Sequence, residues 1–548
     1  MYSFLNIFFA FLFISPVDYP ITLAGNFGEP RPSHFHGGID IKTAQVEGKI
    51  IHSIGDGYIS RVTVGLYGYG NAIYVQHPEG YTSIYCHLKC FVPYLQTLVQ
   101  KYQYLQKKPI VDLKFKPTDF PVSEGQIIAL SGNTGASVAP HLHLEIHRTS
   151  TNEMVDPLDL IDADIIDSTP PLAHGFMATP VDGEGVFQDK PLKQVYPFTS
   201  HELNHNFTAW GKIGFGIWAN DYMEGSFGNK YGIKDTRLIV DGQEVFHSNV
   251  SKISVDDNRK VNSWGDYLHY LRSNVWYMRS YLEPGNRMGA IFVDCNNGII
   301  DFKEERDYHL CYIISDKFGN KAEYRFTVRG KRSIIPKASH KNVFCSIYAN
   351  RPSIISLNDA FIYTREGIVA NDTELSPYIS INKNSLSKCI SFSNTPLPLF
   401  NDALLGLRLI SKVDDVSKLY IVCHQGVDRF IRGWCNNGYV YSYIRDLGAS
   451  YEIAYDDIPP AIVPIGENQW TNNGIITVGI TDKQSGLSSF DAYIDNQFIL
   501  LEPVAKSERF RCKLKDTPIK RINKYRQLLI TTKDKLGNKS QYKTQILY

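Results

Sequence analysis

The 548-residue chain is too long for one hydrophobic core, and at roughly one domain per 150 residues we expect about three to five domains. Its 57 Lys and Arg nearly balance 56 Asp and Glu. This balance argues against nucleic acid or an anionic membrane as a partner, because both select proteins with a basic excess. Tyr (34) and Phe (29) are abundant, and runs rich in Val, Ile and Thr are broken by Gly, Asn and Asp. The composition is typical of β-sheet proteins.

The first fifteen residues contain an apolar run from Phe4 to Ile14. The run is too short to span a bilayer and has the length of the apolar part of a signal peptide. No Lys or Arg precedes it, so a buried first strand or a wrongly assigned start is the alternative. We expect residues 1–15 to direct export.

Residues 16–165 read as short strands separated by Gly-containing turns, which predicts an antiparallel sheet domain. One stretch differs: Val92 to Lys108 has Leu, Val and Tyr at helical spacing, so we expect a helical insertion at about 91–110. Residues 141–148 (HLHLEIHR) alternate strictly. On a strand, His141, His143 and Glu145 would therefore share one face.

An internal repeat divides the rest of the chain. Asp167-Ser-Thr-Pro-Pro recurs as Asp456-Asp-Ile-Pro-Pro, and Asp316-Lys-Phe-Gly-Asn-Lys recurs as Asp534-Lys-Leu-Gly-Asn-Lys. Each copy opens with a Pro-Pro linker and ends with a turn before a final strand, which is typical of immunoglobulin-like β-sandwiches. We therefore predict sandwiches at 166–334, with an insertion, and at 456–548. A β-rich module of unassigned fold occupies 335–455.

Two short motifs suggest chemistry: His36-Gly-Gly-Ile-Asp40 and His141-Leu-His143. Each alone is weak, and a solvated histidine would explain either. Together they supply the three protein ligands and the neighbouring acid/base group that zinc hydrolases need. His36, Asp40 and His143 would bind the metal, which leaves His141 beside it.

Spacing supports this division. On a straight strand the Cα atoms of His36 and Asp40 would lie ~13 Å apart, too far for one ion at ~2.0–2.2 Å from each ligand atom. The chain must bend, and Gly37-Gly38 would allow it. His141 and His143 lie two apart on one strand, so one can bind the metal while the other faces the bound water.

Residues 26–147 resemble the lysostaphin/LytM-type zinc endopeptidases, which cleave the peptide part of bacterial peptidoglycan. Seven pieces match in order: RPSHFHGGID (31–40), GDGY (55–58), GYGN (68–71), YCHL (85–88), VSEG (122–125), SGNTG (131–135) and PHLHLE (140–145). The resemblance implies one Zn²⁺ per chain on His36, Asp40 and His143, with His141 and His87 as the catalytic pair. The sequence of the first piece, with its Phe-His-Gly-Gly-Ile-Asp, and the appended sandwiches resemble those of exported peptidases of Bacteroidetes-type Gram-negative bacteria.

The resemblance also implies positions for the substrate. Tyr69, Asn71 and Asn133 would lie near the groove and position a peptide backbone. Val138-Ala139 replaces the usual Thr-Gly or Gly-Gly, which puts substrate fit in doubt more than metal binding. The helical insertion would roof one end of the groove.

The expected function is a zinc metalloendopeptidase (EC 3.4.24.-) of the periplasm or cell envelope, acting on peptidoglycan cross-links. The sandwiches would position it or bind a protein partner. The alternative is an inactive wall-binding scaffold, or an activator of other wall hydrolases. Which of His141 and His87 is the base is open.

Three lesser predictions accompany this assignment. His34 is an alternative metal ligand, two residues before His36. Cys86 should be a buried apolar residue and not a metal ligand, because the C-x-x-C spacing is absent. Nine cysteines give no disulfide framework, and Cys423 with Cys435 is the nearest plausible pair in the C-terminal half.

Overall fold

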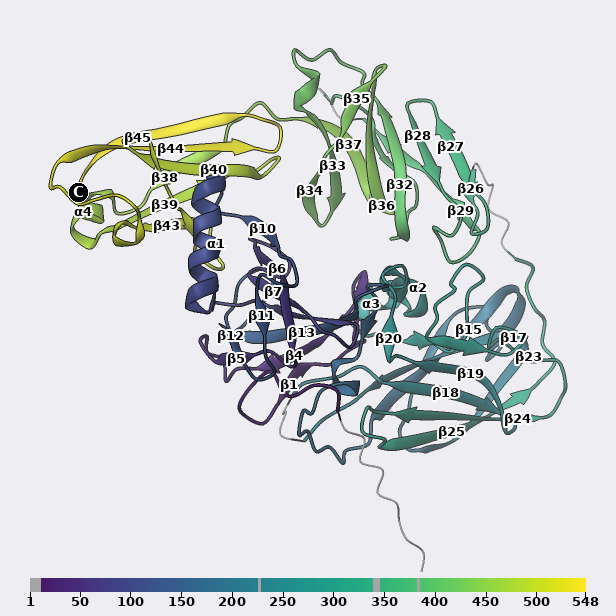
Figure 1. The fold of residues 1–548 in the computed structure, drawn as a ribbon. Coiled ribbons are helices and arrows are strands. Elements are labelled where there is room, and N and C mark those ends of the chain that lie inside the picture. Colours follow the sequence, from purple (N-terminus) through teal and green to yellow (C-terminus); the bar gives the residue numbers. More distant parts are fainter. Residues whose placement is uncertain (1–10, 225–227, 339–344, 382–384) are drawn as a thin grey trace, which may run out of the picture.

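The computed structural model describes residues 11–224, 228–338, 345–381 and 385–548. Figure 1 shows a mainly β molecule whose parts follow one another around an arc, so that the last module returns beside the first domain. The predicted fold class, a β-sheet peptidase-like domain followed by further β modules, is confirmed. No helix within the described residues is long and apolar enough to cross a membrane.

The first domain is built on a sheet whose central order is β1-β4-β13-β8-β7-β6-β10. Its strands are β1 (Leu23–Gly25), β2 (Pro30–Arg31), β3 (His34–Phe35), β4 (Ile39–Lys42), β5 (Ile50–His52), β6 (Gly57–Val64), β7 (Ala72–Gln76), β8 (Tyr81–Cys86), β9 (Cys90–Phe91), β10 (Val111–Lys114), β11 (Pro121–Val122), β12 (Ile127–Leu130), β13 (His141–Arg148) and β14 (Met154–Val155). Leu142, Leu144 and Ile146 of β13 point into the core, so the opposite face carries the histidines, as the alternation predicts.

The predicted helical insertion is α1 (Pro93–Gln106), between β9 and β10. Pro93 suits the first turn, where its missing N–H costs nothing, and Lys107 ends the helix in the left-handed conformation. Leu95 and Val99 anchor α1 in the core of the first domain. Its far end reaches the last module, where the rings of Tyr104 and Phe498 meet edge to face at 5.7 Å.

The apolar stretch predicted to direct export lies mostly outside the described residues. Phe13, near its end, is buried in the core of the first domain. Its ring lies 4.7 Å from that of His77 and 6.1 Å from that of Tyr81. The sheet domain therefore includes residues before position 16.

The second module (166–334) forms one large sheet of order β16-β15-β17-β25-β24-β18-β19-β22. Its elements are β15 (Leu172–Phe187), β16 (Gln194–Pro197), β17 (Glu202–Asn220), β18 (Asp235–Val240), β19 (Gln243–Asn249), β20 (Lys252–Ile253), α2 (Val261–Trp264), α3 (Tyr267–Ser273), β21 (Met278–Arg279), β22 (Ile291–Val293), β23 (Ile300–Phe302), β24 (Asp307–Ser315) and β25 (Lys321–Gly330). β20 leaves this sheet and pairs with β14 of the first domain. The two units are thus joined by strand pairing as well as by the chain.

The third module (335–455) packs two five-stranded sheets, β27-β28-β32-β36-β35 and β30-β31-β37-β33-β34, around one core. Its strands are β26 (Cys345–Ile347), β27 (Ser353–Leu357), β28 (Ala360–Thr364), β29 (Thr373–Leu375), β30 (Tyr378–Ser380), β31 (Cys389–Ser391), β32 (Pro398–Arg408), β33 (Leu419–Gln425), β34 (Val427–Ile431), β35 (Trp434–Asn436), β36 (Tyr439–Asp446) and β37 (Ser450–Tyr455). The suggested Cys423–Cys435 bridge is wrong, since all nine cysteines are unpaired. Cys423 lies on β33 of one sheet and Cys435 on β35 of the other.

The fourth module (456–548) packs two four-stranded sheets, β38-β39-β43-β42 and β41-β40-β44-β45. Its elements are β38 (Ala461–Pro464), α4 (Trp470–Asn473), β39 (Ile475–Thr481), β40 (Leu487–Ile494), β41 (Gln497–Ile499), β42 (Glu502–Pro503), β43 (Arg509–Lys513), β44 (Tyr525–Asp534) and β45 (Lys539–Leu547). Asp495 and Asn496 form the β40–β41 turn with φ of 47° and 66°, and Asp241 and Gly242 form the matching β18–β19 turn with φ of 50° and 81°. Paired positive φ values are those of the hairpin turn that such dipeptides predict.

Candidate active site

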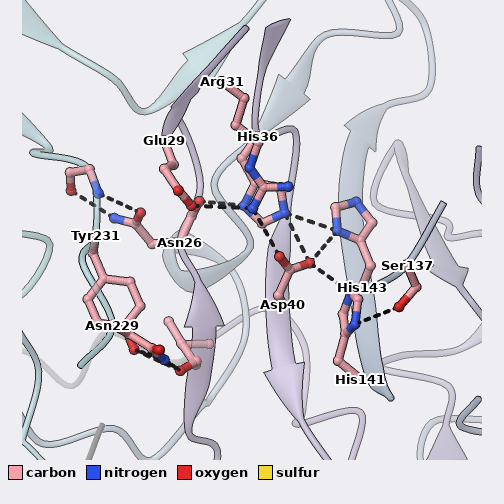
Figure 2. Close-up of polar contacts among 12 residues, drawn as sticks. Asn26, Glu29, Arg31, His36, Asp40, Ser137, His141, His143, Asn229 and Tyr231 are labelled. Carbon is pink, nitrogen blue, oxygen red and sulfur yellow. Dashed lines mark hydrogen bonds and ion pairs between the residues drawn. The ribbon is translucent and has the colours of Figure 1, made fainter. Parts of the chain in front are cut away.

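The strand register brings the predicted metal ligands to one point (Figure 2). β13 lies between β4 and β8, and His143 on β13 is directly opposite Asp40 on β4. On its other side His143 faces Cys86, the residue before His87. His36 lies just before β4 and is buried, as are Asp40 and His143.

Three donor atoms converge at this point. His36 Nε2 lies 3.1 Å from Asp40 Oδ1 and 3.0 Å from His143 Nδ1, and His143 Nδ1 lies 2.7 Å from Asp40 Oδ1. Ligands at ~2.0–2.2 Å from one tetrahedral ion would be separated by ~3.3 Å. The three atoms are therefore already spaced almost as a bound Zn²⁺ would hold them.

The outward nitrogen of each ligand histidine is fixed by an acceptor. His36 Nδ1 is 2.6 Å from the Asn26 carbonyl, and His143 Nε2 is 2.8 Å from Glu145 Oε1. Because both partners accept, the outward nitrogens carry the protons and the inward nitrogens present lone pairs. When both histidines are neutral, two lone pairs and a carboxylate oxygen face each other, an arrangement that a cation or a shared proton stabilises.

The electrostatics of the site agree with a need for positive charge. Burial lowers the pKa of His143, but hydrogen bonds with Asp40 and Glu145 outweigh it and raise the pKa to about 9. The surrounding histidines hold the pKa of Asp40 far below its usual range, although burial opposes them. The donor set thus attracts positive charge, and its two imidazoles and one carboxylate suit Zn²⁺.

Arg31 fixes the second oxygen of Asp40. Its Nη2 donates to Asp40 Oδ2 at 3.1 Å and to Glu29 Oε2 at 3.3 Å. A Cβ on Gly25 would lie 2.9 Å from Asp40 Oδ2 and 3.0 Å from Arg31 Nη2, so only glycine leaves room for this pair. Oδ1 is left to point at the two histidines.

The second module supports the His36 side of the site. The side chain of Asn26 donates to the Gly232 carbonyl at 2.8 Å and accepts from the Gly232 N–H at 2.9 Å. Asn258 of the same module accepts from the Phe35 N–H at 2.7 Å. The second module therefore holds both Asn26, which contacts the His36 ring, and Phe35, which precedes His36 in the chain.

His141 and His87 stand together beside the ligands, with ring centroids 4.9 Å apart. His141 Nδ1 is 2.8 Å from the Ala139 carbonyl, and His87 Nδ1 is 2.8 Å from the Thr134 carbonyl. Each Nδ1 therefore carries the proton, and each Nε2 presents a lone pair. Burial and the neighbouring His143 and His141 lower the pKa of His87 to about 4, so this ring is neutral at neutral pH.

Tyr69 lies beside the metal ligands, with its ring 6.1 Å from that of His143. Its hydroxyl donates to Glu145 Oε2 at 2.7 Å, and His147 Nε2 meets the same oxygen at 2.7 Å. Glu145 therefore joins the ligand His143 to Tyr69 and His147. Tyr69 supports a metal ligand in this way, and its direct contact with substrate stays a prediction.

Asn71 and Asn133 line a cavity of about 690 Å³ between the first domain and the fourth module. Gln96 and Gln103 of α1 line it too, so the helical insertion borders this space. Lys506 of the fourth module closes one edge, where its Nζ donates to the Gly135 carbonyl at 2.9 Å. The cavity places both asparagines where a peptide could reach them, and their role as substrate ligands stays a prediction.

The glycine pair acts differently from the prediction. The chain does leave the strand between β3 and β4, yet neither Gly37 nor Gly38 has a positive φ. A Cβ on Gly38 would lie 2.1 Å from the Leu144 carbonyl oxygen, and one on Gly37 would lie 2.7 Å from Met154 Sδ. The glycines allow this segment to pack closely against β13 and β14. They do not bend the chain through a positive φ.

The other two candidates, His34 and Cys86, are not in the donor cluster. His34 is exposed and its Nδ1 is 3.1 Å from the Pro32 carbonyl, so it is not part of the donor cluster. Cys86 is fully buried, and burial raises the pKa of its thiol. This confirms the interpretation of Cys86 as a core residue.

The sequence did not single out Asn26, Arg31 or the supporting role of Glu145. Glu145 could have been found, because it shares the strand face of His141 and His143. Arg31 lies in the first matching piece, but nothing local indicates its contact with Asp40. Asn26 acts through its backbone carbonyl, which no sequence pattern reports.

The fold and the site together indicate a zinc metallopeptidase domain, because a buried His–Asp–His donor set lies beside two further histidines on an antiparallel sheet. The family comparison agrees, since residues 34–111 match the model of Peptidase family M23. The chain therefore carries a Peptidase family M23 domain. The match includes His36, Asp40 and His87, while His141 and His143 lie beyond it on β13. Residues 346–456 match a Zu5-like domain, which gives the third module a family that the sequence pattern did not.

Two curated relatives resemble the first domain. An uncharacterized metalloprotease of Haemophilus influenzae is 31% identical over 129 residues, which cover 24% of this chain and 20% of that protein. The peptidoglycan DD-endopeptidase ShyA of Vibrio cholerae is 33% identical over 138 residues, covering 24% of this chain and 26% of that protein. The chain thus spans about a quarter or less of each relative. Among solved structures, a zinc-containing peptidase from Vibrio cholerae is 28% identical with a TM-score of 0.20, covering 26% of this chain and 39% of that one.

Proposed function

We propose that the chain is an exported zinc metalloendopeptidase that hydrolyses peptide cross-links of bacterial peptidoglycan. The observation that carries the proposal is the convergence of His36 Nε2, Asp40 Oδ1 and His143 Nδ1 within about 3 Å of one another. The substrate class is supported by the similarity to the peptidoglycan DD-endopeptidase of Vibrio cholerae. We also propose a cell-envelope location, which the proposed substrate and the apolar run at 4–14 support.

His36, Asp40 and His143 would hold the metal. When bound there, Zn²⁺ supplies Lewis acidity toward a peptide carbonyl and lowers the pKa of a water ligand to about 7. Arg31 and Glu145 keep the ligands in place, because each fixes the atom of its partner that does not face the metal.

His141 and His87 provide the proton transfers of the hydrolysis. Both present an Nε2 lone pair, and His141 Nε2 lies 3.3 Å from Asp40 Oδ1, at the edge of the metal site. A neutral imidazole in this position can accept a proton from the attacking water and return it to the leaving amine. A carbonyl oxygen fixes the Nδ1 of each ring, and which ring accepts the proton from water and which protonates the leaving amine stays open.

The variants His141→Ala and His87→Ala test the proposal. Each should lower the rate of release of new amine termini from sacculi by roughly 10²–10⁴, while the protein keeps one equivalent of zinc. His34→Ala is the matched control, because His34 is exposed and outside the donor cluster, and it should change neither quantity. Full activity of His141→Ala with metal bound would refute the assigned role. Wild-type protein that binds wall peptides but releases no amines would favour the scaffold alternative.

A further inference from the structure

Two clusters of three aspartates occur in the second and fourth modules, separate from the proposed zinc ligands. Asp167, Asp221 and Asp316 form one cluster, and Asp456, Asp482 and Asp534 form the other. In each, one carboxylate oxygen per residue lies within 4.8 Å of the others. Asp221, Asp456 and Asp534 are almost completely buried.

The two clusters are copies of one arrangement, as their hydrogen bonds show. In the second module, Asn320 Nδ2 donates to the Asp167 carbonyl at 3.0 Å and to Asp316 Oδ2 at 2.7 Å. In the fourth, Asn538 Nδ2 donates to the Asp456 carbonyl at 2.8 Å and to Asp534 Oδ2 at 2.6 Å.

The first aspartate of each cluster is placed in the same way. Asp167 Oδ1 accepts from the Thr169 N–H at 3.1 Å, and Asp456 Oδ1 accepts from the Ile458 N–H at 3.1 Å. In both modules this aspartate follows the preceding unit and begins the linker to the first strand of the module, β15 or β38.

Among the residues that the structure describes, none forms an ion pair with an aspartate of either cluster. Nearby lysines are engaged elsewhere: Lys317 pairs with Asp159, and Lys535 lies over the ring of Phe430 at 5.1 Å. Burial, together with Asp316 and Asp167, raises the pKa of Asp221 to about 7. Three carboxylates held together without a cation are costly in a buried position.

An independent observation points to a ligand at these positions. Asp167 is 9% exposed, and its Oδ2 is buried without any hydrogen-bond partner. In the fourth module the buried Oγ of Ser485 is likewise unpartnered, while the N–H of the same residue donates to Asp456 Oδ2 at 3.2 Å. Buried polar atoms are normally paired. Asp167 Oδ2 in one cluster and Ser485 Oγ next to the other lack such a partner, which a bound ion or its water ligand would supply.

We propose that each aspartate cluster binds one Ca²⁺ ion, so that the chain carries two calcium sites besides its zinc site. The donors are all oxygen, which favours a hard cation over zinc or copper. A span of up to 4.8 Å matches oxygens on opposite sides of an ion that binds them at ~2.3–2.6 Å. Backbone carbonyls and water would complete the six to eight oxygens that Ca²⁺ takes.

The position of the sites gives them a role. Each lies where a β module joins the unit before it: Asp167 between the first domain and β15, and Asp456 between β37 and β38. At the second junction Lys418 Nζ also donates to the Leu536 carbonyl at 2.9 Å, and the Asp456 N–H donates to the Lys418 carbonyl at 3.1 Å. Calcium would fasten each linker to its sandwich and so fix how the modules are oriented.

Calcium binding by the full-length, zinc-loaded protein tests the proposal. Equilibrium dialysis against ⁴⁵Ca²⁺ should find two ions per chain for wild type, one for Asp221→Asn, one for Asp482→Asn and none for the double variant. The matched controls Asp241→Asn and Asp495→Asn change the hairpin aspartates of the same modules and should keep two. Zinc, measured separately, should stay at one equivalent throughout.

Thermal unfolding separates a ligand role from a structural one. Without calcium, Asp221→Asn should melt at the same temperature as wild type or higher, because the substitution removes repulsion between carboxylates. Calcium should raise the melting temperature of wild type, and it should raise that of the variant by less. A variant that is equally destabilised in both buffers, a wild type that binds no Ca²⁺ at 10 mM, or a preference for Mg²⁺ would overturn the proposal. If Asp221→Asn does not fold, the number of Ca²⁺ ions bound by wild type and by Asp482→Asn decides whether the proposal holds.

Discussion

Glu145 is the residue on which the geometry of His143 depends. It accepts from His143 Nε2 and is fixed in turn by Tyr69 and His147. The His143 contact lowers the pKa of Glu145 below its usual range although burial opposes this, so the carboxylate is ionised and strengthens the histidine as a ligand.

Glu145→Gln should therefore weaken zinc binding by roughly 10–100-fold, the usual effect of losing a partner behind a metal ligand. Competition with a zinc chelator dye measures this affinity. Glu47→Gln is the control, because Glu47 is exposed and forms only a loose pair with Lys89 at 3.7 Å. Equal zinc affinity of Glu145→Gln and wild type would show that the contact does not support the metal.

At the scale of elements, the site is the junction of β4, β13 and β8. The alternation of residues 141–148 allowed the strand and its histidine face to be predicted, because the side-chain period of a strand is two. The pairing of His143 with Asp40 could not be predicted, since register between strands a hundred residues apart depends on the whole sheet. For the same reason the repeat revealed Asp167 with Asp456 and Asp316 with Asp534, but not the third member of either cluster.

Close packing of Gly38 against β13 gives a prediction for this junction. Gly38→Ala would put a methyl group 2.1 Å from the Leu144 carbonyl oxygen, so β4 and β13 must separate. We expect a loss of stability of roughly 1–3 kcal/mol, together with weaker zinc binding. Chemical denaturation measures the first and chelator competition the second.

Gly289→Ala is the control for this substitution, because nothing lies within 4 Å of a Cβ at that position. It should change neither stability nor zinc binding appreciably. If Gly38→Ala matched it in both, the packing argument for the glycine pair would fail.

At the scale of the whole molecule, the first domain does not stand apart from the second module. Phe27, Phe35 and Met154 of the first domain lie in the hydrophobic core of the second module. Figure 1 shows the two units in contact and α1 between the first domain and the fourth module. The surroundings of the zinc site are thus shared among modules, which a motif search confined to residues 26–147 could not reveal.

A buried ion pair between the first domain and the second module can be tested by substitution. Lys234 Nζ donates to Asp156 Oδ2 at 2.7 Å and to Asp159 Oδ2 at 3.1 Å, with the Asp156 side chain only 5% exposed. Lys234→Met leaves Asp156 buried and unpaired, which should cost roughly 3 kcal/mol. Arg61→Met, which breaks an exposed pair with Asp112, should cost less than about 1 kcal/mol.

The contact of Lys234 with Asp159 predicts that stability depends on pH. Burial raises the pKa of Asp159, but Lys234 and Lys317 outweigh it and lower the pKa below its ordinary value of 3.8. The stabilisation is therefore present above that value and is lost as the pH falls below it. Wild type and Lys234→Met should approach each other in stability below about pH 4, as denaturation at several pH values would measure. A difference that stays constant down to pH 2 would exclude this linkage.

Mass spectrometry of sacculi, digested with the wild-type protein or with His143→Ala, tests the central claim most directly. The account predicts that zinc-loaded wild type converts cross-linked muropeptides into uncross-linked ones with one new amine terminus per bond cleaved. His143→Ala, which lacks one of the three metal ligands, should leave the cross-links intact. Unchanged cross-links after digestion with the zinc-loaded wild type, or equal cleavage by His143→Ala, would contradict the account.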